Sequence, residues 1–410
     1  MISSGEENPV VALKIHLRKY AHDGEREYAV TREIRDRGLP GEQVALPFEA
    51  FDIEDGIICL AYPLYGKDLT HWIKDQNRAF SPVEAREIIK KSLEFLNAFH
   101  SIGAAHTDIK PENMLYDPET REIRIIDFGN SERRFKRGTP VATREYTPPE
   151  GIIGGELSQA VDIWSLACTL FEMLTGELLF DPHRAAAEKY VEFSDDEEDE
   201  NTEEEDDGDE EEDDDDEDDA GEFGIGELIG GKYRLIDELG RGNFATVWKA
   251  RVENPHLELP QLARDGQRTE VLQQSQCKDR DQSSEPPRPR KAKEARRHNQ
   301  KRFGVTDAYD LALNYEHLLL MQRLLGPFPG ELTKDGIYHR LYFNSDGALK
   351  FDPEPEKFTP APSVAERLAK GGISKSEAGM IEAFILPMLR FSTLERATAG
   401  ECLSHRWINS

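Results

Sequence analysis

The 410-residue chain is poor in cysteine, has no long apolar run and has no excess of positive charge. Its four cysteines lie far apart and form no C-x-x-C pair, which argues against a disulfide framework and indicates a reducing compartment. No apolar run reaches the roughly 18 residues of a membrane span. Residues 1–10 show neither the charged start nor the apolar stretch of a secretion signal. We therefore expect an intracellular protein without a membrane segment.

Most of the negative charge lies in one segment, the acidic tract of residues 195–219. The formal net charge is −30, and the tract holds 22 Asp and Glu and no Lys or Arg, so the rest of the chain carries −8 (−30 + 22). Self-repulsion and the lack of apolar residues predict a disordered tract. The basic stretch 288–302 favours a nuclear import signal, whereas direct nucleic-acid binding is not expected from an acidic chain without interleaved aromatics. We expect the protein in the cytoplasm and the nucleus.

Globular and low-complexity parts alternate along the chain. Short β-rich runs over residues 10–17 and 56–65 precede a helical pattern over 81–101, which opens with a Ser cap, a Pro and then Glu84. A second strand-like pair surrounds a glycine-rich turn. We predict five parts: globular residues 1–183, an acidic linker 184–226, a hairpin 227–252, a polar and basic linker 253–305, and a globular, mostly helical part 306–410.

The strongest chemical signal is "HTDIKPENML" at residues 106–115, followed by "DFG" at 127–129. Phosphoryl transfer needs a carboxylate that orients the attacking hydroxyl, oxygen ligands for magnesium, and a cation beside the moving phosphate. Asp108 suits the first role and Lys110 the last. Asn113 and Asp127 suit Mg²⁺, which prefers hard oxygen ligands. Each residue alone is an ordinary loop residue, but the ordered set predicts a phosphoryl-transfer site.

These residues resemble the catalytic motifs of eukaryotic protein kinases. Several details are most similar to the SR-protein kinases, which phosphorylate serines in Arg-Ser-rich splicing factors. These details are Thr107 in "HTDIKPEN", the sequence "DFGN", Ala167 in "VDIWSLACTLFEMLTGELLFDPH" and the C-terminal "LPMLRFSTLERATAGECLSHRWINS". The resemblance implies an α+β, bilobal protein-kinase fold, with a small β-rich N-lobe, a helical C-lobe and a disordered acidic insert between the helices known in kinases as αF and αG.

The resemblance also implies an ATP site on the strand that contains "VALK". Lys14 would hold the α- and β-phosphates, and Ala12 would lie against the adenine. Glu33 is the expected carboxylate partner of Lys14. Glu27 remains an alternative, because the helix that holds both glutamates is poorly marked in the sequence.

"ICLAYPLYGKDL" at residues 58–69 resembles the strand and hinge behind the adenine. Tyr62 would be the gatekeeper, Pro63 would offer its carbonyl, and Tyr65 would donate its backbone N–H. Since proline has no N–H of its own, the donor at Tyr65 matters for this site.

Four further residues are expected to support the site by resemblance. Asp162 would hold the catalytic loop through backbone N–H groups, and Glu150 and Arg396 would form a buried ion pair. Thr143 would contact both Asp108 and Lys110.

The glycine-rich turn "LGRGNFATVWKA" at residues 239–250 is out of the usual order, because it follows Asp108 by 132 positions (240 − 108). Gly240 and Gly242 would let the backbone approach phosphates, with Phe244 and Val247 completing the loop. A dinucleotide-binding loop would continue into a helix, whereas "TVWKARV" reads as a strand.

Three interpretations of this order stay open. The hairpin folds back onto its own N-lobe, which linkers of this length permit. Alternatively, it pairs with another copy as a swapped dimer. In the third, the order reflects a faulty gene model or a decayed gene, and the product is a kinase-like scaffold without activity.

The sequence therefore predicts an ATP- and Mg²⁺-dependent serine/threonine protein kinase. Its expected substrates are Arg/Ser-rich proteins, and the expected state is a monomer. The main alternative is a catalytically impaired pseudokinase scaffold, because the glycine-rich loop is out of order.

Overall fold

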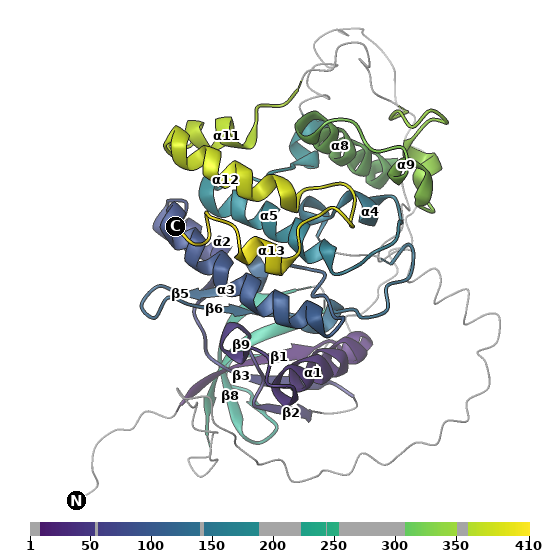
Figure 1. Ribbon diagram of the computed structural model, residues 1–410. Coiled ribbons are helices and arrows are strands. Elements are labelled where there is room, and N and C mark those ends of the chain that lie inside the picture. The colour runs from purple at the N-terminus through teal and green to yellow at the C-terminus, as the bar shows by residue number, and fades with distance from the viewer. Residues whose placement is uncertain are drawn as a thin grey trace, which may run out of the picture.

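The computed structural model describes residues 9–53, 56–139, 143–187, 223–242, 244–253, 308–350 and 360–410. Most residues of the two predicted linkers lie outside the described residues. The predicted disorder of the acidic tract therefore concerns residues that the structure does not describe. The described parts form a sheet-rich N-lobe and a helical C-lobe (Figure 1). The predicted α+β, bilobal fold is confirmed.

Two distant chain segments build the N-lobe sheet. Its six strands are all antiparallel to their neighbours and follow the order β2-β3-β1-β9-β8-β7. Figure 1 shows the late strands beside the early ones in this lobe. The strands are β1 Val10–His16, β2 Glu49–Asp52, β3 Ile58–Pro63, β7 Leu228–Ile229, β8 Tyr233–Arg241 and β9 Ala245–Val252.

The side chains of β1 alternate between the two faces of the sheet, as a period of two residues requires. Val11, Leu13 and Ile15 are buried on one face. They pack there against residues of β8 and β9, among them Trp248 and Leu235. The opposite face therefore carries Ala12 and Lys14, the two residues of this strand that are predicted to contact ATP.

Helix α1 (Ala21–Asp36) packs beside the sheet and follows the short 3-10 helix η1 (Arg18–Tyr20). Its buried residues are Gly24, Glu27, Thr31 and Ile34. A second 3-10 helix, η2 (Gly41–Gln43), leads on to strand β2. Only one large apolar residue lies on the buried face of α1, which explains why the sequence marks this helix weakly.

A small sheet and three 3-10 helices position the catalytic segments. The sheet has the order β4-β5-β6, with β4 Lys67–Asp68, β5 Met114–Asp117 and β6 Glu122–Ile125. The 3-10 helices are η3 Pro111–Asn113, η4 Phe128–Asn130 and η5 Arg144–Tyr146. The β5-β6 hairpin thus lies between the two motifs predicted to act together.

Helices make up the rest of the C-lobe. The predicted helix 81–101 is confirmed, because Ser81 and Glu84 form a reciprocal capping box at its start. The helices are α2 Leu69–Gln76, α3 Pro82–Ser101, α4 Pro149–Ile152, α5 Ala160–Thr175, α8 Ala308–Leu325, α9 Leu332–Asp335, α10 His339–Tyr342, α11 Val364–Lys370, α12 Lys375–Met388 and α13 Ala399–Leu403.

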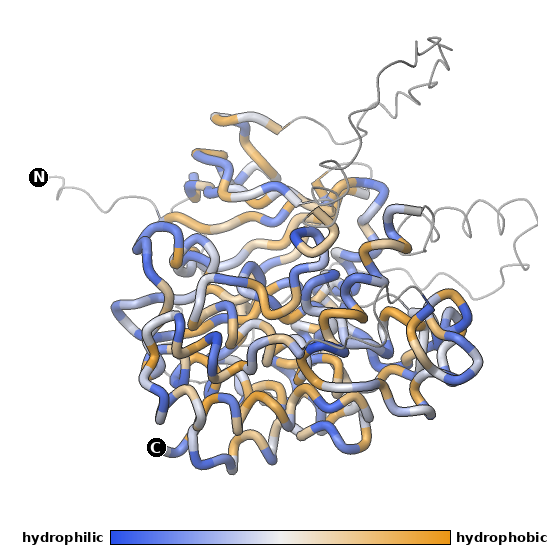
Figure 2. The backbone as a smooth tube through the Cα atoms, turned by 90° about the horizontal axis from the view of Figure 1, so that it is seen from above, coloured by the Kyte–Doolittle hydropathy of each residue, from blue (hydrophilic) through white to orange (hydrophobic). Residues whose placement is uncertain are grey.

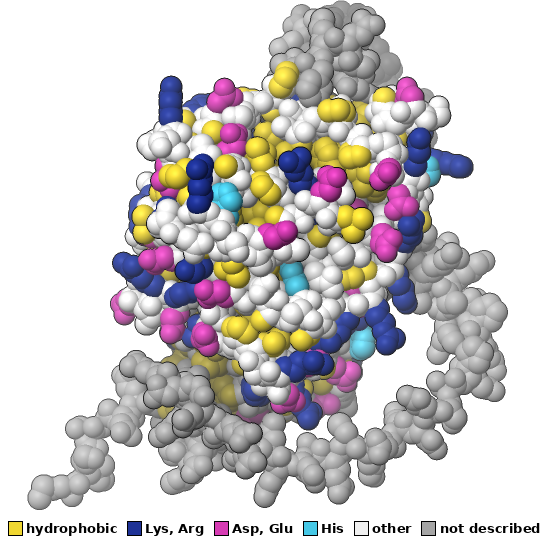
Figure 3. All heavy atoms as spheres, in the orientation of Figure 1, with side chains coloured by type: hydrophobic (Ala, Val, Ile, Leu, Met, Phe, Trp, Pro, Cys, Tyr) yellow, Lys and Arg dark blue, Asp and Glu magenta, His cyan; other side chains and the backbone are white. Residues whose placement is uncertain are grey.

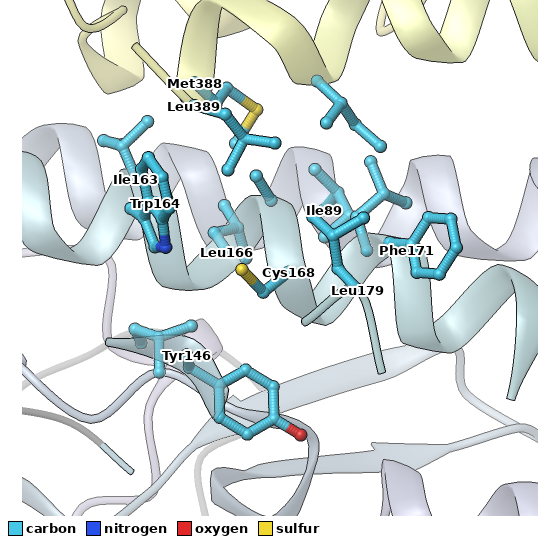
Figure 4. Packing of buried hydrophobic residues seen from close by; sticks show 14 of the residues in the cluster. Ile89, Tyr146, Ile163, Trp164, Leu166, Cys168, Phe171, Leu179, Met388 and Leu389 are labelled. Carbon is cyan, nitrogen blue, oxygen red and sulfur yellow. The ribbon is translucent and has the colours of Figure 1, made fainter. Parts of the chain in front are cut away.

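Helix α5 runs through the middle of the C-lobe core. Trp164, Leu166 and Phe171 of this helix are buried. In Figure 4, Met388 of α12 lies on one side of the helix and Tyr146 of η5 on the other. Along the surrounding helices hydrophobic and hydrophilic residues alternate (Figure 2). Within the described ranges, no helix is long and apolar enough to cross a membrane. The central position of α5 makes it a rigid support for the loops that contact it.

Candidate active site

Asp162 on α5 anchors the catalytic loop, which begins at His106, through two backbone hydrogen bonds. It is fully buried, and its two carboxylate oxygens accept hydrogen bonds from the backbone N–H groups of His106 (2.8 Å) and Thr107 (2.7 Å). Thr107 has a left-handed backbone, with φ of 72°. A non-glycine residue adopts this conformation only when its surroundings fix it, and here Asp162 does so. The predicted support by Asp162 is confirmed.

Asp108, Lys110 and Thr143 form a compact polar cluster. One Asp108 oxygen accepts from the backbone N–H and the hydroxyl of Thr143, both at 3.0 Å. The other oxygen lies 3.0 Å from Lys110 Nζ, which donates to the Thr143 hydroxyl at 2.6 Å. The predicted contact of Thr143 with both residues is confirmed. Asp108 and Lys110 therefore lie side by side on the Thr143 hydroxyl oxygen, and their catalytic roles remain predictions.

Asn113 and Asp127 form a donor set that fits Mg²⁺. The Asn113 amide group donates to the Asp108 carbonyl (2.8 Å) and to the Asp108 carboxylate (3.0 Å), which leaves its oxygen as an acceptor. The Ile126 N–H donates to the backbone carbonyl of Asn113 at 3.0 Å. Because Ile126 directly precedes Asp127, this hydrogen bond links the segments that carry the two candidate ligands. One carboxylate and one amide oxygen suit an ion that usually keeps waters and binds substrate phosphates. Their role as metal ligands remains a prediction.

Lys14 is fixed between two carboxylates. Its Nζ lies 2.6 Å from Glu27 Oε2 and 2.9 Å from Asp127 Oδ1. Burial alone would lower the pKa of Lys14, but Asp127 and Glu27 outweigh burial and hold this pKa above its ordinary value. Burial likewise opposes ionisation of Glu27, but Lys14 prevails and lowers the pKa of Glu27 to about 2. Both groups therefore stay charged at neutral pH.

The prediction that Glu33 is the partner of Lys14 is wrong, and the alternative, Glu27, is confirmed. Glu33 binds Arg37 and Arg133, both at 2.6 Å, at the far end of α1. Six residues of α-helix turn the chain by about 240° and advance it by about 9 Å. Glu33 therefore faces away from the strand that carries Lys14.

The glycine-rich hairpin lies directly beside Lys14. In the register of β1 and β9, Lys14 is opposite Val247 and Ala12 is opposite Lys249. Directly opposed residues share one face, so Val247 lies on the face of Lys14. At the tip, the Phe244 carbonyl accepts from the Leu17 N–H at 2.9 Å, and the Phe244 ring contacts Tyr20 edge to face. The displaced loop thus occupies the position that its predicted role requires.

The hinge residues follow directly from β3. This strand ends at Pro63, and Tyr65 lies just beyond it on the way to β4. Tyr62 is buried, and its hydroxyl donates to Glu27 Oε1 at 2.8 Å. This contact was not foreseen from the sequence, and no local pattern indicates it. The roles of Ala12, Tyr62, Pro63 and Tyr65 toward adenine remain predictions.

An acidic cluster lies beside the catalytic loop. Burial raises the pKa of Glu172 to about 7. The negative charges of Glu112 and Glu145 raise this pKa further, whereas the hydrogen bond from the Tyr146 hydroxyl lowers it. Glu112 is exposed and lies four residues after Asp108. No Lys or Arg within 4.0 Å pairs with Glu172 among the described residues. Of the three carboxylates, Glu145 lies 3.5 Å from His183 Nε2 and has this ion-pair partner within the chain.

The buried ion pair of Glu150 and Arg396 is also present. The guanidinium binds both carboxylate oxygens, at 2.6 and 2.9 Å, and donates as well to the carbonyls of Ala160 and Arg390. Both side chains are almost completely buried. The predicted structural role of this pair is confirmed by its contacts.

The fold and this constellation agree with the family comparison. Residues 3–219, more than half of the chain, match the family described as the protein kinase domain. The chain therefore belongs to the protein kinase domain family, whose members in general use ATP and Mg²⁺.

Individual relatives match only part of the chain. Homeodomain-interacting protein kinase 1 of Caenorhabditis elegans is 31% identical over 180 residues, or 42% of this chain and 21% of the relative. Human dual specificity tyrosine-phosphorylation-regulated kinase 3 is 32% identical over 176 residues, or 42% and 30%. Human dual specificity protein kinase CLK2 is 28% identical over 196 residues, or 42% and 39%. The chain thus spans about a fifth to two fifths of the length of these relatives.

A solved crystal structure of a kinase domain has a similar fold. Its TM-score is 0.56 at 16% identity, and the match covers 99% of this chain and 93% of that chain. At this identity the likeness supports the fold alone.

Proposed function

We propose that the chain is an active serine/threonine protein kinase that transfers the γ-phosphoryl group of ATP to serines in Arg-rich protein segments. The observation that carries this proposal is the pairing of β9 with β1, which brings Val247 beside Lys14. The main argument for an inactive scaffold was the late position of the glycine-rich loop in the sequence. That argument loses its force when the loop lies in the N-lobe sheet.

Each residue of the site has a definite task in this proposal. Asp108 orients the serine hydroxyl and accepts its proton, and Lys110 stabilises the charge that develops on the transferring group. Asn113 and Asp127 would hold Mg²⁺, which when bound neutralises phosphate charge. Lys14, fixed by Glu27, binds the phosphates that do not move.

The Arg-rich substrate class rests on two observations. The sequence motifs resemble those of SR-protein kinases, and the acidic cluster of Glu112, Glu145 and Glu172 lies next to the catalytic loop. A guanidinium group would relieve the mutual repulsion of these carboxylates and form charge-assisted hydrogen bonds with them. We further propose a monomer in the cytoplasm and the nucleus that acts on protein and does not bind nucleic acid directly.

The test is phosphate transfer from ATP to an Arg-Ser repeat peptide by the intact chain. Asp108→Asn should lower kcat by roughly 10²- to 10⁴-fold, the usual contribution of a general base. Matched peptides with Lys for Arg or Tyr for Ser measure the preference for guanidinium and for the acceptor hydroxyl. A folded chain that binds ATP and Mg²⁺ but transfers no phosphate to any peptide would establish the scaffold instead.

A further inference from the structure

Glu27 uses both of its carboxylate oxygens. Oε2 lies 2.6 Å from Lys14 Nζ and 3.4 Å from His16 Nε2. Oε1 accepts a hydrogen bond from the Tyr62 hydroxyl at 2.8 Å. The side chain is only 2% exposed, so no water shell replaces a missing donor. A buried charge of this kind is stable only while its protein partners are in place.

The direction of the Glu27 carboxylate matters, because Lys14 also contacts Asp127. The last side-chain torsion of a glutamate is broad, and one contact does not fix it. Two donors on opposite oxygens, from β1 and β3, do fix it. Oε2 then faces Lys14, and Lys14 is held where it meets the glycine-rich hairpin.

Tyr62 is well placed to serve as the fixed donor. Its ring is buried in a small cluster with Ala45 and Leu60, against which Tyr28 of α1 and Ile126 pack. Ile126 precedes Asp127 directly. Burial, and the nearby charge of Glu27, raise the pKa of Tyr62 well above its ordinary value, so the hydroxyl keeps its proton. The ring thus connects β3, α1 and the segment that leads to Asp127.

We propose that Tyr62 is a positioning residue for catalysis, whose hydroxyl orients Glu27 and through it Lys14 for binding the phosphates of ATP. The proposal rests on the proposed ATP-dependent function. It assigns to the Tyr62 hydroxyl a task separate from the steric role of a gatekeeper, because the ring alone would line the adenine pocket.

The first test is Tyr62→Phe, which keeps the ring and removes only the hydroxyl. We expect kcat/KM for ATP to fall about tenfold, since hydrogen bonds to buried charged groups are among the stronger ones. Tyr28→Phe is the matched control, because Tyr28 packs in the same cluster, and it should change kcat/KM less than twofold. Unchanged kcat/KM in Tyr62→Phe would overturn the proposal.

The second test separates positioning from packing by a double-mutant cycle with Glu27→Gln. The readout is the affinity for a fluorescent ATP analogue with Mg²⁺, which can be measured in variants of low activity. If Tyr62 acts through Glu27, Tyr62→Phe should have no further effect in the Glu27→Gln background. An equal loss of affinity in both backgrounds would refute the positioning role. Failure of the intact chain to bind the analogue would instead count against the proposed function itself.

Discussion

The backbone conformation and the surrounding atoms do not require glycine at either of the two glycine positions near the tip of the hairpin. Neither Gly240 nor Gly242 has a positive φ. A Cβ atom at Gly240 would meet nothing within 4 Å, and one at Gly242 would lie 3.6 Å from the Ala245 carbonyl, an ordinary contact. The described fold therefore has no steric need for glycine at either position, and the proposed function supplies a use for their small size, the close approach of phosphates.

Gly242→Ala should leave the stability of the fold within about 0.5 kcal/mol of the parent, as is usual for surface changes. The KM for ATP should rise about tenfold, equal to ~1.4 kcal/mol of lost binding. Thermal melting and initial rates measure the two effects separately. Gly66→Ala provides the contrast, because its Cβ would clash with the backbone carbonyl oxygen of Tyr116, and this variant should destabilise the fold. Equal melting losses in both variants would contradict this interpretation.

We expect Glu172 to make the proposed substrate preference depend on pH. Its pKa is raised to about 7 from an ordinary value near 4.5, so the carboxyl group of the folded protein ionises as the pH rises through 7. A guanidinium substrate needs the ionised form. The KM for an Arg-Ser peptide should therefore fall between pH 6 and 8, whereas the KM for ATP should not follow the same curve. In Glu172→Gln the peptide dependence should flatten, and its persistence there would assign the titration to another group.

The same pKa shift predicts how Glu172 affects folding. A carboxyl group whose folded pKa is raised makes no difference below the unfolded value, near pH 4.5, and is unfavourable above pH 7. Glu172→Gln should therefore stabilise the fold at pH 8 and have little effect at pH 4.5.

Single residues of the site were predictable from the sequence to different degrees. Asp108 and Asp127 stand in short motifs with fixed spacing, and a spacing is visible without a structure. The partner of Lys14 was not predictable, because α1 buries Gly24, Glu27 and Thr31 and so lacks an apolar stripe that would show which face is inside. The Tyr62 hydroxyl contact depends on two side chains from different elements, which no local pattern records.

At the scale of elements, the structure rests on a few buried connections between segments that are distant in sequence. The Glu150–Arg396 pair joins α4 to the connection between α12 and α13, and the Arg396 guanidinium also lies 5.1 Å from the Trp164 ring. The sequence indicated this pair only by resemblance. Its energetic weight comes from burial, because a lone charge inside the core has no water to solvate it.

Arg396→Met should lower the free energy of unfolding by about 3–5 kcal/mol, since it leaves Glu150 charged and buried. Urea or thermal unfolding measures the loss. The double variant with Glu150→Gln should lose less than the sum of the two single losses. Arg121→Met is the matched control, because the Arg121–Glu87 pair is exposed and such pairs contribute only about 0–1 kcal/mol. A loss at Arg396 as small as that at Arg121 would show that the pair carries no structural weight.

At the scale of the whole molecule, the order of the strands in space differs from their order in the chain. Six residues of the early strands and their turn share one core cluster with six residues of the hairpin: Val11, Leu13, Ile15, Ile57, Cys59 and Ala61 with Ile229, Tyr233, Leu235, Trp248, Ala250 and Val252. The large core of the C-lobe contains none of the hairpin residues. The C-lobe therefore has its own core, whereas the core of the N-lobe sheet depends on the hairpin, which follows the first C-lobe helices in the chain.

Charge is also distributed unevenly at this scale. On the face seen in Figure 3, Lys and Arg side chains are mixed with Asp and Glu rather than separated into large patches. This agrees with the −8 charge that remains outside the acidic tract. The acidic tract itself lies outside the described residues. On this face, the mixed charges therefore give no large field of one sign that would select a basic substrate.

The hairpin packs on the N-lobe strands and shares no core with the C-lobe. It should therefore also dock on these strands as a separate peptide that is not covalently joined to the chain. We predict that a chain whose residues 223–253 are replaced by a Gly-Ser linker of equal length keeps a folded C-lobe but does not phosphorylate the Arg-Ser peptide. Adding a peptide of residues 223–253 should restore activity in a saturable way, because β1 again gains its seven-residue antiparallel partner. A peptide with Leu235→Ala and Trp248→Ala, which lacks two buried contacts, should fail.

The tryptophans separate docking from folding in this experiment. Trp248 is the only tryptophan of the hairpin, whereas Trp72, Trp164 and Trp407 belong to the C-lobe. Fluorescence of the linker variant therefore reports the C-lobe alone, and a shift of the peptide emission on mixing reports burial of Trp248. Full activity of the linker variant without peptide would show that the ATP site does not need the hairpin. Docking without restored activity would instead show that β8 and β9 complete the fold but not the catalytic site, and the order of the chain would then matter for function after all.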